Sequence, residues 1–235
     1  MGTITAEAII NKAATVLMDV ANVKWSRDEL LGWLNDGQRS IVSMVPEASS
    51  TITTISMTSG TRQSLPAGAW MLLDVTRNMG ANGSTPGRAV QRIDRHTLDE
   101  SNPNWQSATP VTSIKCYMYS LRDRSHFYVH PPADGTTKVE VIYSAHPTDI
   151  SVENTAIGIH DMYQPALLDY MLARAFSKKS QYSDPAAATA YFNAFTLFVV
   201  TNAQDAAQLT SMLGALRENI APTVGTTPGG PAPAA

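Results

Sequence analysis

The chain has 235 residues, enough for one large domain or two small ones. Hydrophobic residues make up 43% of it and charged residues 16%, a composition that excludes disorder throughout. Lys and Arg number 17 against 20 Asp and Glu, so the net charge is -3, the opposite of the basic footprint of a duplex-binding domain. We therefore do not expect sequence-specific DNA binding.

The chain shows no sign of export or membrane insertion. A single cysteine, Cys116, cannot form an internal disulfide, so we expect the protein to mature in the cytosol. The first residues lack the basic and apolar regions of a signal peptide, and no window approaches the roughly 18 apolar residues of a membrane span. We expect neither a signal peptide nor a membrane partner.

Two amphipathic helices are predicted in the first 47 residues. Apolar residues recur at spacings of three and four from Thr5 to Val20, which predicts the first helix. Ser26 and Glu29 form a capping box that predicts the start of the second, and Pro46 ends it. The two helices are expected to form a hairpin.

The pattern changes to β structure near residue 50. A mostly β-branched run, Thr51 to Met57, is separated by a turn at Gly60 from the run Arg62 to Leu65, which predicts a β-hairpin. Further strands are predicted at Met71–Thr76, Ile114–Ser120, His126–His130 and Lys138–Tyr143, with turn sequences between them. The long segment from 78 to 110 is expected to pack through Trp105 or to touch a partner.

Helical spacing returns at His160 and stops near Ser183, which predicts a third helix. Asp184 and Pro185 then supply an N-cap and a first-turn proline for a fourth helix, which is expected to end at Gly214. Its wide apolar face is predicted to comprise Ala188, Tyr191, Phe192, Phe195, Phe198 and Val199.

These elements predict an α+β fold, in which N- and C-terminal helical hairpins form a bundle around an inserted small antiparallel β domain. The predicted boundaries are 1–47 and 158–214 for the bundle, 48–157 for the β-rich domain and 215–235 for an extended C-terminal arm rich in Pro, Gly and Ala. The arm has too little apolar surface to fold on itself, so we expect a partner to hold it. Its predicted partner-binding residues are Ile220, Pro222, Val224, Pro228 and Pro231.

No motif with a known catalytic or nucleotide-binding mechanism occurs in the sequence. The best metal candidates are His126 and His130, which would share one face of a strand with Tyr128, but the sequence shows neither a third ligand nor a second shell. The basic run from Arg88 to His96 is interpreted as solvated surface or a contact with an acidic protein. No catalytic, cofactor or metal residue is assigned. Three tryptophans are predicted to lie in the core: Trp25, Trp33 and Trp70.

Several stretches of the sequence together indicate a family. They are Trp25–Leu31, Trp33–Arg39, Gly60–Pro66, Phe127–Pro132 and Leu167–Lys178. On these residues the chain resembles the head-to-tail adaptor proteins of tailed bacteriophages, especially those with short tails. The similarity covers about residues 5 to 200 in the right order and departs at Lys178-Lys179, where Lys-Asp is expected.

The resemblance implies a non-enzymatic structural protein of the virion, located at the head-tail junction and in the host cytoplasm during assembly. Copies of the chain would form a homododecameric ring between the portal protein and a tail hub or nozzle protein. DNA would pass through the ring without specific binding. The arm residues would then contact the portal or the neighbouring subunit.

The residues alone do not exclude two other classes of function. One is a small tail or baseplate binding module that works as a monomer or dimer, and ring formation discriminates it from the adaptor. The other is an enzyme, such as a hydrolase, with an unrecognised motif, which would show a deep pocket with converging polar groups and perturbed ionisation.

Overall fold

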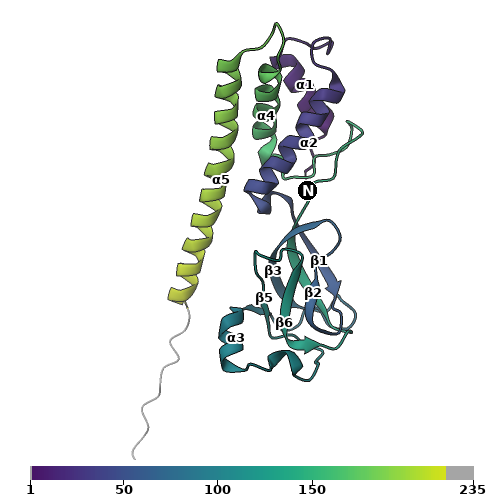
Figure 1. Cartoon of the computed structure of the whole chain (residues 1–235), viewed down its shortest axis with the longest axis vertical. Coiled ribbons are helices and arrows are strands. Elements are labelled where there is room, and N and C mark those ends of the chain that lie inside the picture. Colours follow the sequence, from purple (N-terminus) through teal and green to yellow (C-terminus); the bar gives the residue numbers. More distant parts are fainter. Residues whose placement is uncertain (1, 221–235) are drawn as a thin grey trace, which may run out of the picture.

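The computed structural model describes residues 2–220, which form five α-helices and two small β-sheets (Figure 1). Helices α1, α2, α4 and the first part of α5 make one half of the molecule, and the strands, with α3 beside them, make the other. The predicted mixed α+β class is confirmed.

The first two helices, α1 (Ala6–Val16) and α2 (Arg27–Met44), begin where the sequence predicts. The hydroxyl of Thr5 accepts the Ala8 N–H at 3.4 Å, and that of Ser26 accepts the Glu29 N–H at 3.3 Å. However, α1 ends before Val20, which is 74% exposed, so its predicted place on the apolar face is wrong. The helix stops because the following loop folds around the carboxylate of Asp19.

The last two helices are α4 (Gln164–Ser177) and α5 (Pro185–Ile220). Asp184 caps α5 as predicted, since its Oδ1 accepts the N–H groups of Ala186 and Ala187 at 3.0 and 3.1 Å. The predicted end at Gly214 is wrong, and residues 215–220 are helical instead of part of the arm. One glycine costs a helix only about 1 kcal/mol, and good helix formers follow it until Pro222 disfavours helix in the residue before it.

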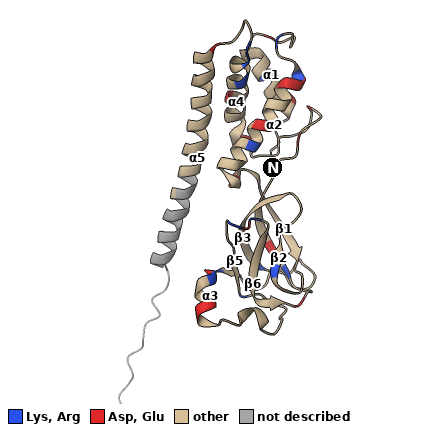
Figure 2. Ribbon diagram, in the orientation of Figure 1, with Lys and Arg blue, Asp and Glu red and all other residues tan. Residues whose placement is uncertain are grey.

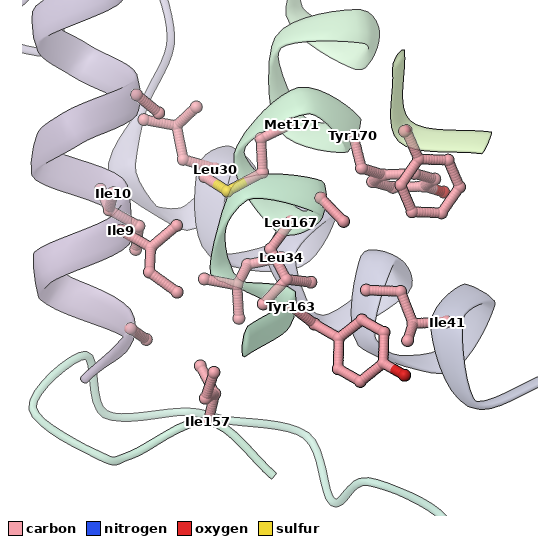
Figure 3. Packing of buried hydrophobic residues seen from close by; sticks show 14 of the residues in the cluster. Ile9, Ile10, Leu30, Leu34, Ile41, Ile157, Tyr163, Leu167, Tyr170 and Met171 are labelled. Atoms are coloured by element: carbon pink, nitrogen blue, oxygen red, sulfur yellow. The ribbon is translucent and has the colours of Figure 1, made fainter. Parts of the chain in front are cut away.

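The helices share one hydrophobic core, which joins residues from both ends of the chain (Figure 3). Ile9 of α1, Leu34 of α2 and Leu167 of α4 are all fully buried there. At Gly37, α2 and α4 approach so closely that a Cβ would lie 3.1 Å from side-chain atoms of Leu167 and Tyr170. The glycine in the stretch Trp33–Arg39 therefore sets the spacing between these two helices.

Two polar residues of the same stretch hold the segment that leads from the strands to α4. The side-chain amide of Asn35 makes two hydrogen bonds of 3.0 Å with the backbone of Ile150. Gln38, which is fully buried, accepts the N–H of Gly158 at 2.7 Å. Because a buried amide needs such partners, these residues tie the segment to α2.

The strands form two sheets, with orders β1-β7-β3 and β2-β6-β5-β4. Their bounds are Ser50–Ser56 for β1, Gly60–Ser64 for β2, Ala69–Asn78 for β3, Gln91–Arg92 for β4, Cys116–Met118 for β5, His126–Ala133 for β6 and Lys138–Ala145 for β7. All pairs are antiparallel except β4 with β5.

The predicted hairpin of β1 and β2 is wrong, because the two strands belong to different sheets. β1 pairs with β7 and β2 with β6, so the short turn between them carries the chain from one sheet to the other. The apolar side chains between the sheets form a second core, centred on Phe127, Val129, Val139 and Val141.

The long connection between β3 and β5 contains α3 (Arg95–Ser101) and a 3-10 turn at Trp105–Ser107. Trp105 is fully buried, and its indole Nε1–H donates to the Asp99 carboxylate at 2.6 Å. The ring also meets Tyr128 and His130 edge to face. The prediction that this connection packs through Trp105 is confirmed.

Candidate interaction surface

Helix α5 has an unusual composition for a helix at the edge of a bundle. From Pro185 to Gln204 it contains no Asp, Glu, Lys or Arg. Figure 2 shows charged residues on α1, α2 and α4, whereas residues 185–204 of α5 carry none. A solvent-facing helix normally carries charge on its outer side, so this composition indicates that the outer side meets another protein surface.

One side of α5 packs against the bundle. Ala188, Phe195 and Val199 are buried there, and Tyr191 and Phe198 are half-buried, as predicted. The prediction fails for Phe192, which is 51% exposed, because it lies next to the buried side and not within it.

The outer side of α5 carries a stripe that suits helix packing. Its residues are all exposed and alternate in spacing by four and three: Ala186, Ala190, Asn193, Leu197, Val200 and Gln204. We call this set the α5 stripe. Leu197 is 69% exposed and Val200 40%, and the alanines leave room for close approach of another backbone. This repeat is the pattern by which helices pair along a seam.

A groove between α4 and α5 lies beside the stripe. Tyr170, Ala173 and Arg174 of α4 line it together with Ala188 and Phe192 of α5. The guanidinium of Arg174 lies 5.6 Å from the ring centroid of Tyr170, so the charge is held against an aromatic surface. The groove can therefore receive an apolar side chain from a partner, with a cation at its margin.

The loop between α1 and α2 presents a second apolar surface. Met18, Val20 and Val23 are 88%, 74% and 84% exposed. The carboxylate of Asp19 accepts the backbone N–H groups of residues 23, 24 and 25 at 3.0, 2.7 and 3.0 Å, which fixes the loop shape. Burial acts to raise the pKa of Asp19, but these hydrogen bonds and the charge of Lys24 outweigh it and lower the pKa below its ordinary value.

A hollow lies in the β half, beside α3 and the strands β5 and β6. Arg92, Arg95, Arg122, Tyr119 and Tyr128 are among the residues that line it. One of its cations is already paired, because Arg95 lies 3.3 Å from Asp99 and its guanidinium lies over the Tyr128 ring. His96, at the end of the basic run, pairs with Glu100 at 3.2 Å.

The two metal candidates take different partners. His126 and His130 alternate with buried Phe127 and Val129 along β6, as the sequence predicts. Nδ1 of His126 lies 3.0 Å from the Asp123 carboxylate, whereas the ring of His130 packs on Trp105 and burial lowers its pKa. Among the side chains that the structure describes, no group of three His, Cys, Asp or Glu is placed to hold a metal ion.

The tryptophans predicted for the core differ in burial. Trp25 is buried, and its Nε1–H donates to the Ala175 carbonyl at 3.3 Å. Trp33 and Trp70 are half-buried against the helical core. None forms an exposed stacking platform of the kind that binds single-stranded nucleic acid.

The predicted arm residues lie at or beyond the end of the described chain. Ile220 is the last residue of α5, and its side chain is not described. Pro222, Val224, Pro228 and Pro231 lie outside the described residues. Sequence reasoning missed the α5 stripe and the loop at Met18, although the absence of charge over twenty residues was a visible signal for the stripe.

These features define a protein whose distinctive surfaces are apolar and suited to other proteins. Across residues 2–220, no helix has both the length and the hydropathy needed to cross a membrane. The chain belongs to the SU10 adaptor protein family, whose model matches residues 4–220. This membership confirms the resemblance to phage head-to-tail adaptors and supports a structural role in the virion. No curated protein matches the chain.

Proposed function

We propose that the protein is a head-tail adaptor whose copies form a closed ring, of twelve subunits, between the portal vertex and the tail. DNA would pass through the ring without specific binding. The observation that carries the proposal is the stretch 185–204 of α5, which has no charged residue and exposes Leu197 and Val200. The family match, which covers residues 4–220, includes this helix.

A ring needs two different contact surfaces on each copy, because head-to-tail contacts join unlike sides. The α5 stripe and the α4/α5 groove supply one side. The opposite side would belong to the α1 and α2 helices and the β half of the neighbour. Such a contact is expected to bury more than about 1,000 Å² per pair, the size of a specific interface.

The remaining surfaces would serve the axial partners. The fixed loop with Met18, Val20 and Val23 lies at the end of the bundle away from the strands, so it can enter an apolar pocket on the portal or on the tail hub (Figure 1). The arm residues Ile220, Pro222, Val224, Pro228 and Pro231 would hold the portal or the adjacent copy. Prolines keep such a segment extended at low entropic cost.

The α5 stripe can be tested with one charge. Leu197→Asp places a carboxylate in the proposed contact, whereas the side chain faces away from the core, so the melting temperature should stay within a few degrees of wild type. We expect the variant to remain folded but to lose assembly in native mass measurements. Leu197→Ala is the matched control, since it shortens the same exposed side chain without adding a charge. Equal assembly of both variants would contradict the proposed contact.

A further inference from the structure

The strand β1 has an open edge. It pairs with β7 on one side, in an unbroken register from Ser50 opposite Ser144 to Ser56 opposite Lys138. Ser50 N–H, at the start of β1, donates to the Glu47 carbonyl. For Thr51 to Ser56, no backbone hydrogen bond outside the pairing with β7 occurs in the described part of the chain. Every second residue of β1 therefore directs an N–H and a C=O away from the sheet.

The edge strands β3 and β2 carry protection that β1 lacks. The outer edge of β3 is covered, because Asn78 N–H donates to the Arg88 carbonyl at 2.9 Å and Val90 N–H to the Thr76 carbonyl at 3.0 Å. β2 carries Arg62 and an irregularity in its pairing with β6. Bulges, charges and covering segments are the usual devices that stop an edge from pairing.

None of these devices is present in β1. Its sequence, STITTIS, has no charge and no proline, and it is rich in β-branched residues. Ile52 is 63% exposed on it. A strand of this kind is a ready acceptor for an added strand, in which backbone hydrogen bonds supply affinity.

We propose that β1 accepts residues 223–227 of a second copy of this chain as an added strand. This segment, Thr-Val-Gly-Thr-Thr, has four β-branched residues and every backbone N–H, and Pro222 and Pro228 flank it. Because prolines have no N–H to donate, they delimit a pairing segment of five residues. At about 3.3 Å per residue it fits along the seven residues of β1.

The position of α5 favours a second copy over the same chain. With 36 residues α5 is about 54 Å long, so it extends beyond the bundle and ends at the level of the strands (Figure 1). In Figure 1 α5 lies on one side of the β half and β1 on the other. In a head-to-tail ring the α5 side of one copy faces the β1 side of the next. The inference thus rests on the proposed ring. It identifies β1 of the next copy as the binding site of the C-terminal arm.

Proline substitutions in the full-length chain test the backbone pairing. Thr226→Pro with Thr227→Pro removes two neighbouring N–H donors, and Thr226→Ala with Thr227→Ala keeps them as the matched control. We expect amides of residues 50–56 to exchange with deuterium at least about tenfold more slowly in assemblies of wild type and the alanine control than in the proline variant. Both substitutions lie beyond α5, so the fold is not at risk.

Cysteine pairs on separate chains identify the donor. In a Cys116→Ser background, a chain with Ile52→Cys is mixed with one carrying Thr223→Cys or Val224→Cys. Neighbouring strand residues face opposite sides, so one of the two arm variants should cross-link to Ile52→Cys and the other should not. Ser64→Cys on the protected strand β2 is the control and should give no cross-link.

Three results would overturn the inference. One is that the chain assembles but the β1 amides exchange at the same rate in all variants. The proposed ring would then stand, and the added strand would be refuted. Another is that the β1 amides are protected from exchange only when portal protein is present. The added strand would then come from the portal protein. The third is β1 protection without cross-links between separate chains, which assigns the strand to the same copy. A wild-type chain that never assembles would instead refute the proposed function.

Discussion

The ammonium group of Lys178 lies 2.7 Å from the carboxylate of Glu29 and joins the end of α4 to the first turn of α2. Glu29 is the residue that would complete the capping box with Ser26, yet its carboxylate accepts a hydrogen bond from this lysine. The pair links the two halves of the helical core at the end of the bundle. Both side chains are about one-third exposed, so solvent screens the attraction.

We expect the coupling free energy of this pair to be about 0.2 to 1 kcal/mol. A double-mutant cycle with Glu29→Ala and Lys178→Ala, followed by urea unfolding, measures it. The neighbouring Lys179→Ala is the control and should show no coupling to Glu29. A coupling well above 2 kcal/mol would mean that the pair is more deeply enclosed than its exposure indicates.

Trp105 should anchor the long connection between β3 and β5. Trp105→Ala removes a fully buried ring and its hydrogen bond to Asp99, so we expect a loss of about 3 to 5 kcal/mol in the free energy of unfolding. Trp105→Phe keeps most of the packing and should cost less. If the alanine variant is as stable as wild type in urea, the connection does not depend on this side chain.

The loop at Met18 should respond to acid through Asp19. A carboxylate with a lowered pKa in the folded protein contributes stability above its unfolded pKa of about 4, and that contribution is lost as pH falls through the folded pKa. Asp19→Asn should therefore be less stable than wild type at pH 7, and the difference should shrink in more acidic solution. Urea unfolding at several pH values checks this.

Asp28→Asn is the control for the acid response, since Asp28 is exposed in the first turn of α2. It should change stability little at any pH. If the free energy of unfolding of Asp19→Asn is lower than that of wild type by the same amount from neutral to acidic pH, the role assigned to the Asp19 charge is contradicted.

Local signals in the sequence predicted local structure well. Ser26 and Asp184 start their helices because a cap needs a side chain only a few residues from its partner. The alternation of His126, Phe127, Tyr128 and Val129 was equally visible, because a strand with one buried face repeats every two residues.

Features that depend on distant residues were not predictable in the same way. The pairing of β1 with β7 joins residues far apart in sequence, and adjacency alone favoured a hairpin with β2. Phe192 has the same chemistry as the buried Phe195, and only the packing of α4 decides which ring is covered. The α5 stripe had one signal in the sequence, the absence of charge from Pro185 to Gln204, but its alanines and Asn193 do not resemble an apolar face.

The mass of the full-length assembly, measured by native mass spectrometry alone and with portal protein, tests the proposed ring most directly. The proposal predicts a closed oligomer of about twelve copies that binds one portal ring, as expected of subunits joined by unlike surfaces. Electron microscopy of the same sample should show a central channel. A chain that stays monomeric at high concentration, and also in the presence of portal protein, would contradict it.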